Sequence, residues 1–315
     1  MDKSRLRLRC SIIGVALLLM PLASYLMNRG LELLVRLEAA GGWGWPPLAW
    51  QGLAVGVNAL YILIPLCFLL KMAGVPARRL LPLSLPRADY TIPAVGVSFG
   101  VSLGGNLLSS LALGLLAGLG FQAQVAMPVF QGGPAAVFLT MLLAAVFPAL
   151  LEELLFRGAI LQYLRPYGGG FAVLVSGVLF ALCHSSAAQF FPALVMGLCL
   201  GCFAVRSGSL LPGMIFHFAY NSAVIGLYLV QLQQGMEAYT TMTFIFFGIS
   251  AAVAAVSAVF LGRRFGPVFA LPSAGCPLSR EDKAAAVFTS VPLLSAGVIF
   301  LCFIAASLTW VGVPG

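Results

Sequence analysis

The chain has 315 residues, of which 61% are hydrophobic and 8% are charged, with a formal net charge of +8. A soluble domain carries about 25% charged residues, so this composition excludes a soluble globular protein and indicates a polytopic membrane protein. The positive balance is explained by membrane topology and requires no nucleic-acid partner.

Nine apolar segments have roughly the length that a membrane span needs. A helix crosses ~30 Å of hydrocarbon with about 20 mostly apolar residues. The predicted spans are 10–27, 49–70, 91–118, 134–156, 169–184, 189–205, 209–231, 242–261 and 286–309. They predict an all-α polytopic bundle of about eight to nine transmembrane helices. The first segment follows a basic head, but further spans come after it, so we interpret it as a span and not as a cleaved signal peptide.

The domain organisation follows from the absence of repeats and long linkers in the sequence. No internal repeat of 20–50 residues is visible, and no stretch is long enough to separate soluble domains. We therefore expect a single membrane domain over residues 1–315. Within it we distinguish N-terminal helices at 10–118, a core at about 131–231 and C-terminal helices at 242–309.

Positive charge gives the predicted orientation, because Lys and Arg accumulate in cytoplasmic loops. All of the 17 lysines and arginines except Arg29 and Arg36 fall on one side of the predicted spans. This places the N-terminus of a multi-pass protein of the cell membrane in the cytoplasm and the C-terminus outside.

The segments 169–184 and 189–205 form a predicted hairpin with basic residues at both outer flanks. Charge alone is compatible with two full crossings and with a shorter hairpin whose tip, residues 185–188, stops inside the membrane. We favour partial penetration, since irregular backbone is tolerated at membrane depth where it lines a cavity. Labelling of residues 185–188 from outside would refute it.

Two glutamates and an arginine follow the uncharged run from Gln131 to Leu151, in the sequence Glu152-Glu153-Leu-Leu-Phe-Arg157. The surrounding segment, 134–163, would extend ~45 Å as a helix, so it overshoots the bilayer, and Pro148 is the expected site of a kink. Glu153 and Arg157 are i,i+4 neighbours suited to an ion pair, while Glu152 points to another side. A carboxylate in an apolar cavity binds a proton more readily than one in water, which suits Glu152 to general-base chemistry.

The chain has only two histidines, and each lies in an apolar stretch with a partner four residues away. Phe180 and His184 share one helix face, and His217 and Asn221 share another. Taken singly, such residues are often hydrogen-bonded core residues or glue between helices, and a Glu–Arg pair is often a topological anchor. Placing an ionisable group inside the membrane costs free energy, however, and the ionisable groups here are concentrated in three short motifs. This concentration indicates a functional site.

The division of labour usual in hydrolysis can be assigned to these residues. A water between Glu152 and His184 can lose a proton and attack a peptide carbonyl, while His217 and Asn221 offer donors to the developing oxyanion. We therefore expect an intramembrane catalytic cavity in the bundle.

The motifs EExxxR, FxxxH and HxxxN, in this order on successive membrane helices, resemble those of the CAAX protease and bacteriocin-processing (CPBP, or Abi) family of intramembrane glutamic endopeptidases. The resemblance covers Glu152 to Asn221. It implies that Glu152 and His184 activate the water, that His217 and Asn221 form the oxyanion site, and that Glu153 and Arg157 support that site.

The leading prediction is an intramembrane endopeptidase that needs no cofactor or metal and cleaves peptide bonds near the cytoplasmic membrane face. Its expected partners are membrane lipids and a peptide or lipid-modified protein substrate. A zinc-dependent membrane protease is a second hypothesis, because two histidines and a carboxylate can hold catalytic zinc, although HExxH is absent. A non-catalytic membrane protein that binds a peptide or lipid, or confers immunity, is the third.

Overall fold

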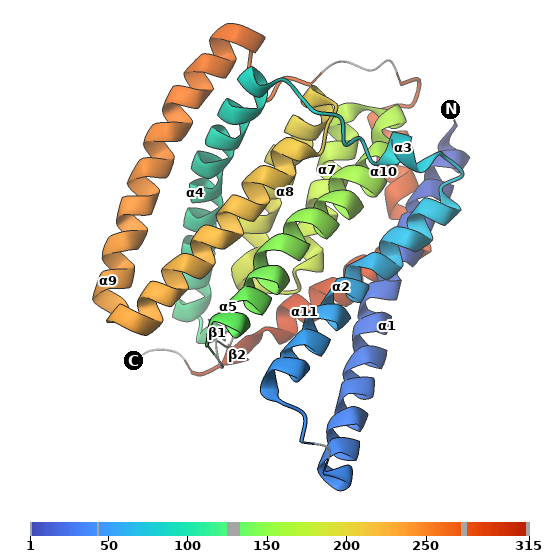
Figure 1. The fold of residues 1–315 in the computed structure, drawn as a ribbon. Coiled ribbons are helices and arrows are strands. Elements are labelled where there is room, and N and C mark those ends of the chain that lie inside the picture. The colour runs from blue at the N-terminus through green and yellow to red at the C-terminus, as the bar shows by residue number, and fades with distance from the viewer. Residues whose placement is uncertain (1, 43, 125–132, 272–275, 313–315) are drawn as a thin grey trace.

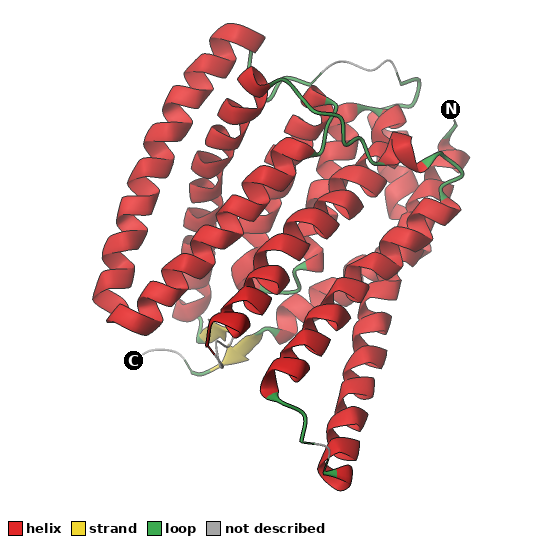
Figure 2. Ribbon diagram, in the orientation of Figure 1, coloured by secondary structure: helices red, strands yellow, loops and turns green. Residues whose placement is uncertain are grey.

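The computed structural model describes residues 2–42, 44–124, 133–271 and 276–312, and almost all of them are helical (Figures 1 and 2). Residues 131 and 132, with which the predicted core begins, lie outside the described part. The elements are α1 (Lys3–Gly41), α2 (Pro47–Met72), α3 (Ala77–Leu80), α4 (Ala88–Gly118), β1 (Phe121–Ala123), α5 (Gly133–Met141), the π-helical η1 (Leu142–Val146) and η2 (Pro148–Ile160), α6 (Leu161–Leu164), the 3-10 turn η3 (Arg165–Tyr167), α7 (Gly169–Cys183), α8 (Ala187–Ser207), α9 (Leu211–Phe265), α10 (Arg280–Phe288), α11 (Val291–Ala306) and β2 (Leu308–Trp310).

The predicted fold class is confirmed: the protein is an all-α, multi-pass membrane bundle. By length and composition, six helices of the described part can cross a membrane, or seven if the bent pair α10–α11 is one span. This count takes α9 as one helix, although the predicted spans 209–231 and 242–261 correspond to helical segments on either side of a backbone break at Gly235. Helix α7, which the sequence predicted as a span, is not counted, because its 15 residues reach only ~22 Å.

Helix α9 is a hairpin of two helical limbs, because its backbone is non-helical at Gly235, where φ is 87° and ψ is −177°. Figure 1 shows the second limb returning beside α4. Glycines on α4 allow this close approach, since a Cβ at Gly96 or Gly100 would collide with Ser257 or Ala254 on that limb. The break at Gly235 therefore turns one long apolar element into two packed helices.

Helices α7 and α8 pack just as closely, which brings the end of α7 into the centre of the bundle. A Cβ at Gly197 on α8 would lie 3.0 Å from backbone atoms of Gly177 on α7. Phe180, one turn along α7 from Gly177, is fully buried. The glycine contacts therefore fix the position of the α7 end that carries the FxxxH motif.

The two ends of the bundle differ in charge and in structure. The basic segment α3 and helix α10 lie near the N-terminal end of α1, while β1 and β2 lie near the C-terminus at the opposite end (Figure 1). An ion pair of 3.2 Å between Lys3 Nζ and Asp282 Oδ1 joins α1 to α10. The antiparallel pair β1–β2, which the sequence did not predict, joins residues 121–123 to 308–310.

Candidate active site

The EExxxR motif lies on η2, a segment whose hydrogen bonds are π-helical. The sequence led us to expect α-helical geometry here, and the structure differs from this, whereas the kink expected at Pro148 stays a prediction. Pro148, the first residue of η2, has no amide hydrogen and so makes no helical hydrogen bond to a preceding carbonyl. A π-helix bonds residue i to i+5, and π-helical turns occur frequently at functional sites.

Glu153 and Arg157 form the ion pair that their spacing predicts. Oε1 of Glu153 lies 2.8 Å from Nη1 of Arg157, and each side chain is 1% exposed. The guanidinium carbon of Arg157 also lies 3.9 Å from the centroid of the Phe180 ring. A buried pair of this kind holds its two elements in register, because losing either partner leaves an uncompensated charge in an apolar interior.

His217, on the first limb of α9, lies between the two glutamates. Its Nδ1 is 3.2 Å from Oε1 of Glu153 and its Nε2 is 3.9 Å from Oε2 of Glu152. The Glu152 side chain is 19% exposed, yet its Oε2 is buried without a hydrogen-bond partner in the described part of the chain. Oε2 of Glu153 is likewise buried without a hydrogen-bond partner, but its Oε1 is held by both Arg157 and His217. Glu152 has only the longer contact with His217, so it is the less constrained of the two carboxylates.

Gly213 provides the space in which Glu153 sits, and sequence reasoning missed it. A Cβ at this position would lie 2.6 Å from Oε2 of Glu153 and 3.3 Å from its carboxyl carbon. Gly213 precedes His217 by four residues, so the same i,i+4 argument that paired the motif residues could have placed it on the site's face.

His184 is the first residue beyond α7, and its ring is held by Phe180. Its Nδ1 lies 2.8 Å from the carbonyl oxygen of Phe180. A carbonyl oxygen only accepts, so Nδ1 carries the hydrogen in this contact, and Nε2 of the neutral ring is left as an acceptor. The ring of Phe180 lies edge-on to both histidines, with centroids 4.6 Å from His184 and 6.1 Å from His217. The ring of Phe180 therefore sets the separation between the two imidazole rings.

The backbone turns sharply just after His184. Ser185 has φ of 53°, in the left-handed region that few residues other than glycine adopt. The next helix starts at Ala187, whose amide donates to Oγ of Ser307 (3.0 Å), and Ser109 donates to the carbonyl of Ala188 (2.7 Å). Contacts from α4 and from the end of α11 thus hold the turn that follows His184.

Asn221 lies one helical turn beyond His217, is half-buried and makes no side-chain hydrogen bond to a described residue. Its neighbour Tyr220 accepts a 2.8 Å hydrogen bond from Nδ2 of Asn106 on α4 and stacks on Phe216. Asn106 is a polar residue in an apolar helix. Its free-energy cost inside the membrane, the same property that drew attention to the histidines, could have identified it from the sequence as well. It links α4 to the helix that carries HxxxN.

Among the described residues, no group of three or more His, Cys, Asp or Glu side chains is arranged so that it could hold a metal ion. At the centre, His217 contacts both Glu152 and Glu153, and Glu153 also pairs with Arg157. Phe180 packs against Arg157 and both histidines, His184 and His217. Fold and site together therefore define a multi-pass helical membrane protein with a buried carboxylate–histidine centre.

Comparison with known families agrees with this class. Residues 134–223 match the family model of the type II CAAX prenyl endopeptidase Rce1-like proteins. The match contains all three motifs and confirms the resemblance to CPBP proteases, so it supports a CAAX-protease-like intramembrane protease at the level of the family. No curated protein and no solved structure is significantly similar to the chain.

Proposed function

We propose that the protein is an intramembrane endopeptidase in which a glutamate and a histidine activate water for hydrolysis of a peptide bond. The observation that carries the proposal is the buried, unpartnered Oε2 of Glu152, 3.9 Å from Nε2 of His217. A buried acceptor without a partner is costly, so its presence beside an imidazole favours a site that binds water or substrate.

The proposed reaction begins with a water held between Glu152 and His184. Glu152 takes a proton from this water, assisted by Nε2 of His184, and the oxygen attacks the carbonyl carbon of the peptide. The C–N bond then breaks, and the proton held by Glu152 passes to the leaving amine nitrogen. Water and peptide thereby give a carboxylic acid and an amine, so the atoms balance.

His217 and Asn221 are assigned to the oxyanion that forms on the carbonyl oxygen. In this proposal Nδ1–H of His217 donates to Glu153, so Nε2 carries a hydrogen for the oxyanion only in the imidazolium form. The amide of Asn221, which bonds to no described residue, supplies a second donor. Arg157 positions Glu153 and so acts through His217 and not on the substrate.

The proposed orientation places the N-terminus and the basic end of the bundle in the cytoplasm of a cell in whose membrane the protein is multi-pass. All of the lysines and arginines except Arg29 and Arg36 support this orientation through the positive-inside rule. Cleavage is then expected near the cytoplasmic face, on lipid-modified C-termini or on leader and signalling peptides.

The test is cleavage of a mixed pool of prenylated and unmodified peptides by the purified protein in detergent. Wild type is compared with Glu152→Ala, with a chelator arm, and with Glu237→Ala as a matched control at an exposed glutamate. We expect turnover that survives the chelator and Glu237→Ala and falls by about 10²–10⁴-fold in Glu152→Ala. Turnover retained in Glu152→Ala, or lost with chelator and restored by zinc, would overturn the proposal.

A further inference from the structure

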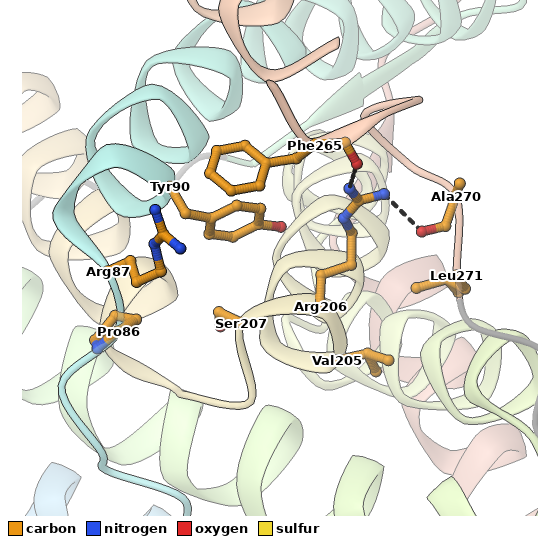
Figure 3. A pocket seen from close by; sticks show the side chains of 9 residues that line it. All are labelled: Pro86, Arg87, Tyr90, Val205, Arg206, Ser207, Phe265, Ala270 and Leu271. Carbon is orange, nitrogen blue, oxygen red and sulfur yellow. Dashed lines mark hydrogen bonds between the residues drawn. The ribbon is translucent and has the colours of Figure 1, made fainter. Parts of the chain in front are cut away.

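A cavity of about 510 Å³ lies at the basic end of the bundle, and none of its lining residues belongs to the three motifs. Its walls come from the start of α4, the end of α8 and the segment that follows α9. Figure 3 shows the ring of Tyr90 between the side chains of Arg87 and Arg206, with Phe265 above it. Two guanidinium groups and a phenol therefore share one cavity.

Arg206 is fixed by the backbone and still has donor capacity. Its Nη1 donates to the carbonyl of Ala270 (2.7 Å) and its Nη2 to that of Phe265 (2.9 Å), as Figure 3 shows. Its Nη1 also donates to the carbonyl of Pro267 (2.6 Å). Its Nε donates to no residue of the described chain. These bonds shape the loop that closes the cavity and hold the guanidinium rigid, which lowers the entropic cost of binding an anion.

Arg87 contributes a second, more exposed guanidinium. Its Nε and Nη2 bond to the carboxylate of Asp89 at 3.0 and 2.6 Å, which leaves Nη1. Arg264 lies 4.0 Å from the same carboxylate. The guanidinium groups of Arg87 and Arg264 thus flank the Asp89 carboxylate, and Arg206 lines the same cavity as Arg87. This local excess of positive charge attracts an anion.

The hydroxyl of Tyr90 points to a missing ligand. The side chain is 7% exposed, and its hydroxyl oxygen faces the guanidinium of Arg206 without a well-formed hydrogen bond to it or to any other described residue. Its ring packs edge-on against Phe203 and Phe265, at centroid distances of 6.2 and 5.3 Å, and these contacts favour the buried position of the hydroxyl. A buried hydroxyl without a partner is rare in native proteins, and a bound acceptor would satisfy it.

We propose that this cavity binds a phosphate group, with Tyr90, Arg87 and Arg206 as donors to its oxygens. Arginine matches the oxygens of phosphate through its planar fork of N–H groups. The phosphate belongs either to the headgroup of an anionic phospholipid or to a soluble phosphate ester. The site lies outside the catalytic motifs, so the proposal stands independently of the proposed protease activity.

The test titrates the purified full-length protein with dioleoylphosphatidylglycerol and dioleoylphosphatidylcholine, followed by native mass spectrometry. Inorganic phosphate and glycerol 3-phosphate are titrated in a parallel arm. The variants are Tyr90→Phe, which keeps the ring packing, and Arg87→Gln. The matched control is Arg79→Gln, which removes the same charge from an exposed position on α3 that does not line the cavity.

We expect saturable binding of one phosphate-bearing ligand, about tenfold weaker in Tyr90→Phe and in Arg87→Gln, as befits loss of a donor to a charged group. Arg79→Gln should bind like wild type. Selective binding of phosphatidylglycerol supports the lipid source, and binding of the soluble phosphates, with displacement of lipid, supports the soluble source. Equal weakening in all three variants, or no preference of the protein for any phosphate-bearing anion over phosphatidylcholine, would overturn the proposal.

Discussion

Two ion pairs of this molecule have similar N···O distances, but one lies in the protein interior and the other is exposed. In the centre, Glu153 and Arg157 approach to 2.8 Å with 1% of each side chain exposed, whereas at the basic end Lys3 and Asp282 approach to 3.2 Å with 50% and 42% exposed. Distance alone would rank the two pairs as near equals. Burial separates them, because removal of one partner from a buried pair strands a charge, whereas water solvates the survivor of an exposed pair.

Arg157→Ala is expected to give the largest effect, because it strands the Glu153 carboxylate in the interior. The loss should be about 3–5 kcal/mol in the free energy of unfolding, measured by denaturant titration in mixed micelles. The double variant Glu153→Ala/Arg157→Ala should lose less than the sum of the two single variants. Additive losses would show that the pair is not coupled and would remove the contrast between the two regions.

Gly213→Ala tests the buried ion pair of Glu153 and Arg157 without removing a charge. The new Cβ would lie 2.6 Å from Oε2 of Glu153, a side chain held by both Arg157 and His217. We expect a loss of about 1–3 kcal/mol from overpacking, together with reduced cleavage. Gly226→Ala on the same helix, where nothing lies within 4 Å, is the control and should cost no stability. Equal behaviour of the two variants would contradict the placement of Glu153.

Asp282→Asn tests the exposed region and should give the smallest effect. It removes the charge that faces Lys3 but retains a side chain that can accept from Ser279. Both partners are well solvated, so we expect a melting temperature in detergent that cannot be distinguished from that of wild type. A drop comparable to that of Gly213→Ala would mean that this pair, and not burial, secures α10 to α1.

Much of the site could be predicted because polar residues are scarce in this chain. The i,i+4 spacing of Glu153 and Arg157 predicted their ion pair, and the structure contains it. Every predicted span except 286–309 also corresponds to a helical segment of the bundle, and 286–309 includes the 70° bend between α10 and α11. In an apolar sequence a charged residue is stable at few positions and usually pairs with another polar group. The spacing of charged residues therefore indicates ion pairs more strongly than it would in a soluble protein.

Contacts between helices were not predictable in the same way. Nearly every face of these helices is apolar, so periodicity does not show which face meets which neighbour. The contact of His217 with both glutamates and the space at Gly213 depend on the rotation of α9 against η2. The π-helical geometry around Glu152 also leaves no periodic signature in a uniformly apolar run.

In the proposed mechanism Glu152 performs the chemistry while Glu153 maintains the structure. The most direct measurement compares cleavage rate and melting temperature for Glu152→Gln and Glu153→Gln, purified in the same detergent. We predict that Glu152→Gln loses about 10²–10⁴-fold in rate with an unchanged melting temperature, while Glu153→Gln loses both rate and stability. A Glu152→Gln protein that cleaves at the wild-type rate would contradict the account.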